Sequence, residues 1–178
     1  MNKFNVDTTI FPHIVVDNFL SIDDYNTLVQ FGKDASDKLD DIRAKIDLNN
    51  TNIVNTAKYL PVLESYMKEL KPENLEKEYY LDMLMLITTS DYHKVVHRDS
   101  EKKLLSCVVY LYPENNYGTF LGPANKCDYQ IPWKTNRAFI FCRGDDTWHT
   151  YKAKENELPR CSVNLTLNLK RNSNDKHR

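Results

Sequence analysis

The sequence has little glycine, no long apolar run and no closely spaced cysteines. Only 4 of its 178 residues are glycine, so the turns between any strands must be made mainly by Asn, Asp and Pro. No apolar run approaches the roughly 18 residues that a membrane span needs. The N-terminal stretch MNKFNVDTTIFPHIVV has an early Asp and no uninterrupted apolar core, so it does not predict a secretory signal. These absences argue against a membrane partner.

An excess of charge of either sign is also missing. The formal net charge is -1, so no overall field would attract nucleic acid or an anionic membrane. A nucleic-acid demethylase would need a phosphate-binding surface, and this balance argues against one. The cysteines include no CxxC pair, and Cys107, Cys142 and Cys161 lie in strand-like runs where small buried thiols are common. We therefore expect a protein of the reducing cytoplasm.

The first part of the chain predicts a strand followed by a helix. The run Phe11–Phe19 is short and apolar. Ser21 is placed to cap a helix whose first turn contains Asp23 and Asp24, where carboxylates suit the helix dipole. We expect this helix to fray towards Leu39.

Two further segments complete the N-terminal part. Residues 34–52 are polar and charged, and they predict either a second helix or a mobile surface segment. The run Leu60–Leu70 is a better helix, with Pro61 at the first helical position and Pro72 just beyond its end.

After Pro72 the chain is rich in β-branched, aromatic and aliphatic residues, interrupted by Asn, Asp, Gly and Pro. The strand-like runs are Tyr79–Thr88, Leu104–Tyr112, Thr119–Leu121, Arg137–Cys142, Trp148–Tyr151 and Cys161–Leu169. Evenly spaced strands after a helical start predict an α+β, mainly β fold: a double-stranded β-helix (a cupin-like jelly roll) buttressed by N-terminal helices. We expect one domain over residues 1–170 and a disordered polar tail over residues 171–178.

The stretch SDYHKVVHRDSEKKLLSCVVYLYP contains His97 and Asp99, two residues apart. Side chains at i and i+2 of a strand point to the same face, so this imidazole and carboxylate would converge. They are two of the three ligands of the 2-His-1-carboxylate triad that binds Fe(II), and His149 is the candidate for the distant third. Taken alone, the HxD motif is equally explained by a hydrogen-bonded surface pair at the end of a strand.

The order of the features that follow strengthens this interpretation. The strand run Leu104–Leu111 follows the HxD motif, then come the turn GTFL at 118, the apolar run NRAFIF at 136, Trp148-His149 and Arg160-x-Ser162. This set resembles the Fe(II)- and 2-oxoglutarate-dependent oxygenases, specifically their small prolyl-4-hydroxylase-like branch. The opening FPHIVVDNFLSIDDYNTL also resembles the first strand and helix of that family, so the resemblance covers most of the chain.

The resemblance implies an enzyme that uses Fe(II), 2-oxoglutarate as co-substrate, and O₂. Three protein ligands on one side of the metal leave three positions, which suits a bidentate 2-oxo acid and one oxygen site. The implied reaction is hydroxylation of a protein side chain, such as a prolyl ring, or of a small metabolite, with release of succinate and CO₂. The carboxylate of Asp99 argues against the halogenating variants, which leave that ligand position open for halide.

The resemblance also implies where the co-substrate binds. Its far carboxylate needs a fixed cation if it is buried, and Arg160 offers a bidentate fork with Ser162 on the same strand face. Tyr110 falls where the family often places a tyrosine hydroxyl on that carboxylate. Asn164 continues the face, where it could touch the metal-bound water, the co-substrate or the substrate, or be a satisfied buried amide.

Other interpretations of these residues remain open at this stage. Arg160 could form a surface ion pair with Glu155 or Glu157, and Tyr110 could be an ordinary core aromatic. Many relatives have another tyrosine about ten residues before the first histidine of the motif, but this sequence has isoleucine there. Tyr92 could take over that role from a different position.

Two other functional classes compete with the hydroxylase. One is a non-catalytic, cupin-like jelly-roll binding module that keeps a metal site without turnover. The other is a metal-dependent oxygenase that does not use 2-oxoglutarate. For the primary substrate, the small basic cluster of Arg98, Lys102 and Lys103 permits an anion, but a solvated turn explains these charges equally well.

Overall fold

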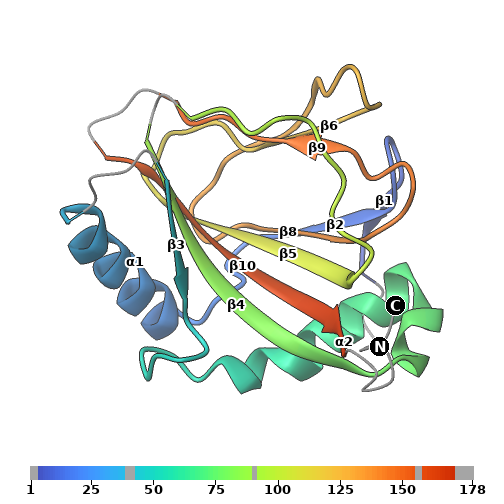
Figure 1. Ribbon diagram of the computed structural model, residues 1–178, viewed down its shortest axis with the longest axis horizontal. Helices are drawn as coiled ribbons and strands as arrows, with labels where there is room; N and C mark the ends of the chain where they lie inside the picture. The colour runs from blue at the N-terminus through green and yellow to red at the C-terminus, as the bar shows by residue number, and fades with distance from the viewer. Residues whose placement is uncertain (1–3, 39–42, 90–91, 155–157, 171–178) are drawn as a thin grey trace, which may run out of the picture.

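The computed structural model of the chain describes residues 4–38, 43–89, 92–154 and 158–170. Within these residues, the chain forms two antiparallel β-sheets, two α-helices and two short 3₁₀ helices at Thr56–Tyr59 and Pro72–Glu76 (Figure 1). The mainly β architecture with N-terminal helices that the sequence predicted is confirmed, and the pair of antiparallel sheets is consistent with a jelly roll.

Both sheets are antiparallel throughout. The order of strands in the large sheet is β1 (Val6–Asp7), β2 (His13–Val16), β8 (Ala138–Cys142), β5 (Lys103–Tyr112), β10 (Arg160–Leu169), β4 (Tyr79–Thr88) and β3 (Arg43–Asp47). The order in the small sheet is β7 (Tyr129–Ile131), β6 (Thr119–Leu121) and β9 (His149–Thr150).

The large sheet has a helix-covered face and a face that looks towards the small sheet. Helices α1 (Ile22–Ser36) and α2 (Leu60–Leu70) pack on the first face, and their buried Leu28 and Leu63 share one core with alternate residues of β4, β5 and β10. A smaller aromatic cluster that includes Phe139 and Phe141 of β8 and Leu121 of β6 joins the two sheets. In Figure 1, β6 and β9 run along the top, and both helices lie below the large sheet.

The helix signals in the sequence are confirmed. The Ser21 hydroxyl caps α1 by accepting a hydrogen bond of 3.3 Å from the amide of Asp24. Pro61 lies in the first turn of α2, and Pro72 follows the end of that helix. The three cysteines expected in strands are buried free thiols on β5, β8 and β10. Among the described residues, no helix is long and apolar enough to cross a membrane.

The prediction for residues 34–52 was wrong. Helix α1 ends at Ser36, and Arg43–Asp47 form β3, an edge strand that pairs with β4, rather than a second helix or a mobile surface segment. The reason is alternation: Ala44 and Ile46 pack towards the core while the charged residues between them point the other way. Strand β7 was also not predicted, and Leu39, Glu155, Glu157 and the tail 171–178 lie outside the described residues.

Candidate metal centre

The structure brings His97, Asp99 and His149 together. His97 and His149 form an antiparallel backbone bridge, with N–H···O distances of 3.0 Å and 2.9 Å in the two directions. This pairing sets the two imidazoles side by side, with ring centroids 4.4 Å apart. One ligand atom from each imidazole and from the Asp99 carboxylate all lie within 4.8 Å of one another. Three potential metal ligands therefore converge on one point, as the HxD spacing and the distant histidine predicted.

Both imidazoles are oriented by the carbonyl two residues before them. Nδ1 of His97 lies 3.0 Å from the Val95 carbonyl oxygen, and Nδ1 of His149 lies 3.0 Å from that of Thr147. A carbonyl only accepts, so each Nδ1 carries the proton, and each Nε2 keeps its lone pair. This tautomer, with the second ring nitrogen bonded to a backbone carbonyl, is the one that metal-ligating histidines adopt.

The Asp99 carboxylate is fixed by two donors. Lys103 Nζ donates to Oδ1 at 2.9 Å, and Ser106 Oγ donates to Oδ2 at 2.5 Å. Each oxygen keeps a further lone pair, so the carboxylate is held in position and can still bind a metal ion. Both donors lie in the first half of β5, the strand that follows the HxD motif.

The protonation states of the three groups suit a cation. Burial, and then the neighbouring His149, lower the pKa of His97 to about 4. Burial also lowers the pKa of His149. For Asp99, burial acts to raise the pKa, but Lys103, His149 and Ser106 together outweigh it and lower the pKa. At neutral pH the site therefore presents two neutral imidazoles and one carboxylate, the state that binds a divalent metal ion.

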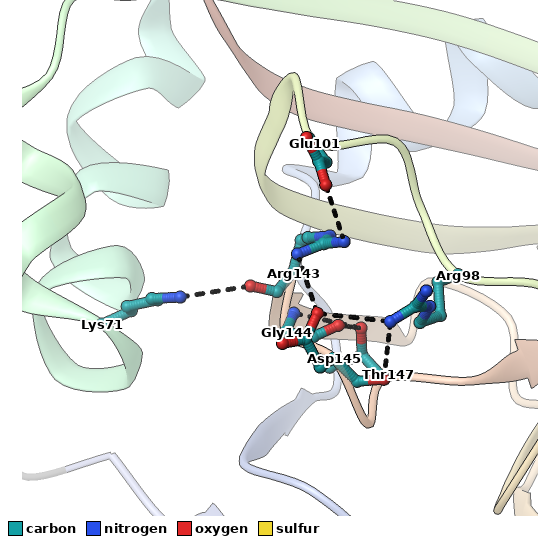
Figure 2. A network of polar contacts seen from close by, with 7 residues as sticks. All are labelled: Lys71, Arg98, Glu101, Arg143, Gly144, Asp145 and Thr147. Atoms are coloured by element: carbon teal, nitrogen blue, oxygen red, sulfur yellow. Dashed lines mark hydrogen bonds and ion pairs between the residues drawn. The ribbon is translucent and has the colours of Figure 1, made fainter.

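Figure 2 shows how the HxD segment is linked to the loop that leads into His149. Arg98 Nη1 donates to the backbone carbonyl of Asp145 at 3.1 Å and to its carboxylate at 3.2 Å, and Arg143 donates to the same carboxylate at 3.3 Å. The Arg98 guanidinium also lies 4.6 Å from the ring centroid of Trp148. Because Asp145 is 83% exposed, this pair adds little stability, and its main consequence is geometric.

The three residues open onto a cavity of about 290 Å³ between the sheets. Arg160, Ser162 and Asn164 line the same cavity, because alternate residues of β10 share one face. Their neighbours Cys161, Val163 and Leu165 belong to the helix-side core. The structure therefore brings the predicted co-substrate residues of β10 and the predicted metal ligands into one pocket.

Arg160 is a buried cation inside an aromatic enclosure. The residue is 1% exposed, and its guanidinium carbon lies 4.3 Å from the ring centroid of Tyr151, 5.0 Å from that of Trp133 and 5.7 Å from that of Tyr110. Nη1 donates to Ser162 Oγ at 3.2 Å, whereas Nε has no hydrogen-bond partner among the described residues. Arg160 is thus not a surface residue, and its alternative partners, Glu155 and Glu157, lie outside the described residues.

Within the described residues, no carboxylate forms an ion pair with Arg160. A buried guanidinium is costly unless an anion pairs with it. The Oδ1 atom of Asn164, on the same face, is likewise buried without a partner there. An anionic ligand would pair with Arg160, whereas Asn164 Oδ1 needs a hydrogen-bond donor such as a bound water or a hydroxyl or amide of a ligand.

The two candidate tyrosines differ in placement. The Tyr110 hydroxyl donates to Thr119 Oγ1 at 2.8 Å, and the ring stacks on Trp133 with centroids 4.5 Å apart. Thr119 lines the cavity, so Tyr110 lies just behind the wall beside Arg160. Tyr92 accepts a hydrogen bond of 2.9 Å from Arg43 and packs against Tyr151.

No protein-family model and no curated protein sequence matches the chain. Among solved structures, it is similar to a viral collagen prolyl hydroxylase from Paramecium Bursaria Chlorella virus-1 in complex with 2OG, with a TM-score of 0.66 and 14% identity over 89% of this chain and 96% of that chain. It is also similar to a Pseudomonas putida prolyl-4-hydroxylase, with a TM-score of 0.63 and 15% identity over 89% and 93%. The chain has the prolyl hydroxylase fold.

The prolyl hydroxylase fold is shared with a second kind of protein. The non-heme alpha ketoglutarate dependent epimerase from nogalamycin biosynthesis gives a TM-score of 0.64 and 12% identity over 88% of this chain and 76% of that chain. At these sequence identities the similarity concerns the fold alone. For the fold, it confirms the family resemblance inferred from the order of motifs.

Sequence reasoning missed several residues around this pocket. Tyr151 lies two residues after His149 and so shares its strand face, a spacing that could have identified it. Lys103 was considered only as part of a basic cluster that could meet an anion, and Ser106 carried no signal, so neither was predicted to donate to Asp99. Arg43 lines the cavity from β3, the strand that was not predicted.

Proposed function

We propose that this protein is a non-haem Fe(II)- and 2-oxoglutarate-dependent dioxygenase. In this proposal His97, Asp99 and His149 bind Fe(II), and the reaction hydroxylates a protein side chain of prolyl type or a small metabolite, with release of succinate and CO₂. The observation that carries the proposal is the pairing of a converging 2-His-1-carboxylate set with a buried guanidinium in the same cavity.

The donor set fits Fe(II). Two imidazole nitrogens with free lone pairs and one ionised carboxylate match the facial triad of such iron sites in ligand type and number. When bound, Fe(II) would coordinate the 2-oxo acid and O₂ and supply the oxidising chemistry. The protein's own part is to orient these ligands, through the two carbonyls behind the imidazoles and the two donors on Asp99.

Arg160 would bind the far carboxylate of 2-oxoglutarate. Its fork can make a bidentate contact, and Ser162 lies within hydrogen-bond distance of its Nη1. Tyr151, Trp133 and Tyr110 surround the guanidinium and would exclude water from that contact. Asn164, whose Oδ1 has no partner in the described part of the chain, would accept a hydrogen bond from substrate or from bound water.

Two finer parts of the proposal concern architecture and location. We take the two facing sheets to be the halves of a double-stranded β-helix, formed as one domain over residues 1–170. The buried free thiols on β5, β8 and β10 favour the reducing cytoplasm.

The proposal is tested by anaerobic titration of the metal-free protein. Fe(II) followed by 2-oxoglutarate should give a weak visible charge-transfer band in the wild type. His97→Ala and Asp99→Ala should abolish the band, whereas Arg160→Lys, which keeps the charge but loses the bidentate fork, should raise the 2-oxoglutarate concentration needed. No band in the wild type at saturating metal would contradict the proposal.

The competing classes are separated by turnover. Under air, the wild type should convert 2-oxoglutarate to succinate slowly even without primary substrate, which a non-catalytic binding module cannot do. An oxygenase that does not use 2-oxoglutarate would be indifferent to Arg160→Ala. A screen of peptides and metabolites for faster succinate release then identifies the primary substrate.

A further inference from the structure

The edge strand β3 gives the cavity a charged wall. Its sequence Arg-Ala-Lys-Ile-Asp alternates, so that Ala44 and Ile46 pack towards the core while Arg43 and Lys45 line the cavity. Arg43 and Arg160 both pair with Thr88 of β4, one from each side, so they occupy one row across the sheet. Along this wall Arg160 is buried, Arg43 is half-buried and Lys45 is exposed, so β3 forms the outer part of the cavity, which we call its mouth.

A third cation reaches the mouth from the opposite side. Lys94 lies on the segment that precedes the HxD motif, and its amide donates to the Tyr151 carbonyl at 2.9 Å, next to strand β9. Lys94 lines the same cavity as the two β3 residues. Arg43, Lys45 and Lys94, which we name the mouth cluster, thus come from two separate walls.

The mouth cluster differs from the other cations of the cavity in its partners. Lys103 is paired with Asp99, and Arg98 with Asp145. Among the described residues, no carboxylate forms an ion pair with any member of the mouth cluster, and Asp99 is the one carboxylate that lines the cavity.

The three cations of the mouth cluster line one cavity of about 290 Å³ and lie close enough for their charges to repel one another. Arg43 donates to the Tyr92 hydroxyl, and its Nε is buried without a hydrogen-bond partner among the described residues. The pKa of Lys45 is lowered, first by Arg43, then by partial burial and by Lys94 and Lys103. Cations held close together at the entrance of a concave site are a binding site for an anion, because a bound anion removes their repulsion.

We propose that Arg43, Lys45 and Lys94 bind an anionic group, a carboxylate or a phosphate, on the primary substrate. This inference rests on the proposed function, in which Arg160 is occupied by the co-substrate and leaves the mouth cluster for the second reactant. The anion would be held at the mouth, with the uncharged part of the substrate directed inwards to the candidate metal centre. A neutral prolyl peptide would leave the mouth cluster uncompensated.

The inference is tested first by binding to the metal-free protein, which keeps the measurement independent of catalysis. The probes are N-acetyl-O-phosphoserine amide, N-acetyl-aspartate amide and the neutral N-acetyl-asparagine amide. Binding of each probe is monitored by the amide chemical shifts of ¹⁵N-labelled protein. We expect one or both anions to shift amides of β3 and of residues 92–97. The neutral probe should bind about tenfold more weakly or not at all, because it cannot form charge-assisted hydrogen bonds. The anion that binds more tightly shows whether the group recognised on the substrate is a phosphate or a carboxylate.

Matched variants locate the site. Lys45→Gln/Lys94→Gln should weaken the preferred anion by about tenfold or more, with Lys45→Gln alone as a milder second variant. The control Lys33→Gln/Lys68→Gln removes the same charge from exposed positions on the helices and should leave the affinity unchanged. Arg160→Gln should keep the anion affinity.

The inference is overturned if the mouth-cluster variants bind the anions as tightly as the wild type, if the neutral probe binds equally well, or if Arg160→Gln alone abolishes binding. The last result would mean that the anions enter the co-substrate site. The two proposals fail separately. Normal Fe(II) and 2-oxoglutarate binding without anion affinity contradicts the mouth cluster, whereas anion affinity without metal binding contradicts the dioxygenase.

Discussion

Arg160→Met should stabilise the metal-free protein while it removes binding of 2-oxoglutarate. Arg160 is 1% exposed, and no carboxylate pairs with it among the described residues. The folded protein without ligand therefore carries the cost of a desolvated charge. Methionine has a similar length, no charge and enough flexibility to fill the space between the aromatic rings.

The magnitude follows from the contacts that offset this cost. Desolvation of a buried ion costs several kcal/mol after relaxation of the protein. The rings of Tyr151 and Trp133, at 4.3 Å and 5.0 Å, return part of it, at roughly 1–2 kcal/mol for each cation–π contact. The hydrogen bond to Ser162 returns about 1 kcal/mol. We expect the free energy of unfolding to rise by roughly 1–3 kcal/mol in the variant, with a gain in Tm of about 2–4 °C per kcal/mol.

Chemical denaturation of the metal-free wild type and variant measures the first half of this prediction. The second half is measured with metal and 2-oxoglutarate present. A ligand at 100 times its Kd should stabilise the wild type by about 2.7 kcal/mol and leave the variant unchanged. Arg137→Met is the control: Arg137 is partly buried and pairs with Asp17 at 2.7 Å, so its loss should destabilise.

One result would refute the reasoning about Arg160. Breaking a buried ion pair by removing one partner costs about 3–5 kcal/mol. If Arg160→Met lowers the free energy of unfolding by that amount, the guanidinium is already neutralised by a partner within the protein. It would then not be a site kept for an anionic ligand.

Two further substitutions test the scaffold around the site. Asp17→Asn should cost about 1 kcal/mol at pH 7 after allowance for the exposure of this carboxylate. Hydrogen bonds from Arg137 and then Lys134 lower its pKa to about 2, so the loss should be full above pH 4 and vanish as the pH falls through 2, measured by urea denaturation across that range. Gly32→Ala should destabilise by about 1–3 kcal/mol although alanine favours helices. Its Cβ would lie 3.0 Å from two atoms of the buried Tyr112 ring system, and a rise in Tm would contradict this.

The candidate metal ligands could be predicted because each depends on a local rule. The HxD spacing places two side chains on one face, and the strand-like run around His149 offers a third. Their meeting, however, depends on one backbone bridge between residues that are far apart in the sequence. The order of motifs predicted that His149 joins the pair only through resemblance to a family, and the bridge itself was not predicted, because alternation alone does not determine which strands become neighbours.

Strand β3 shows why the rest could not be predicted. Arg43–Asp47 is short, polar and at a sheet edge, so it lacks the apolar run by which interior strands are recognised. Only its pairing with β4 turns alternate charged residues into a wall of the cavity. The mouth cluster is therefore a property of the tertiary structure, and no window of sequence contains it.

The same register that buries the core also sets the position of the candidate site. Strand β10 is paired with β4 over its whole length, from Arg160↔Thr88 to Leu169↔Tyr79. A slip of one residue would turn Arg160 towards the helices and expose Cys161 to the cavity. Such a slip would remove apolar side chains such as Val163 from the helix-side core, so core packing opposes it. The placement of Arg160 beside the candidate metal ligands is thus enforced by residues on the opposite face of the strand, which never touch the cavity.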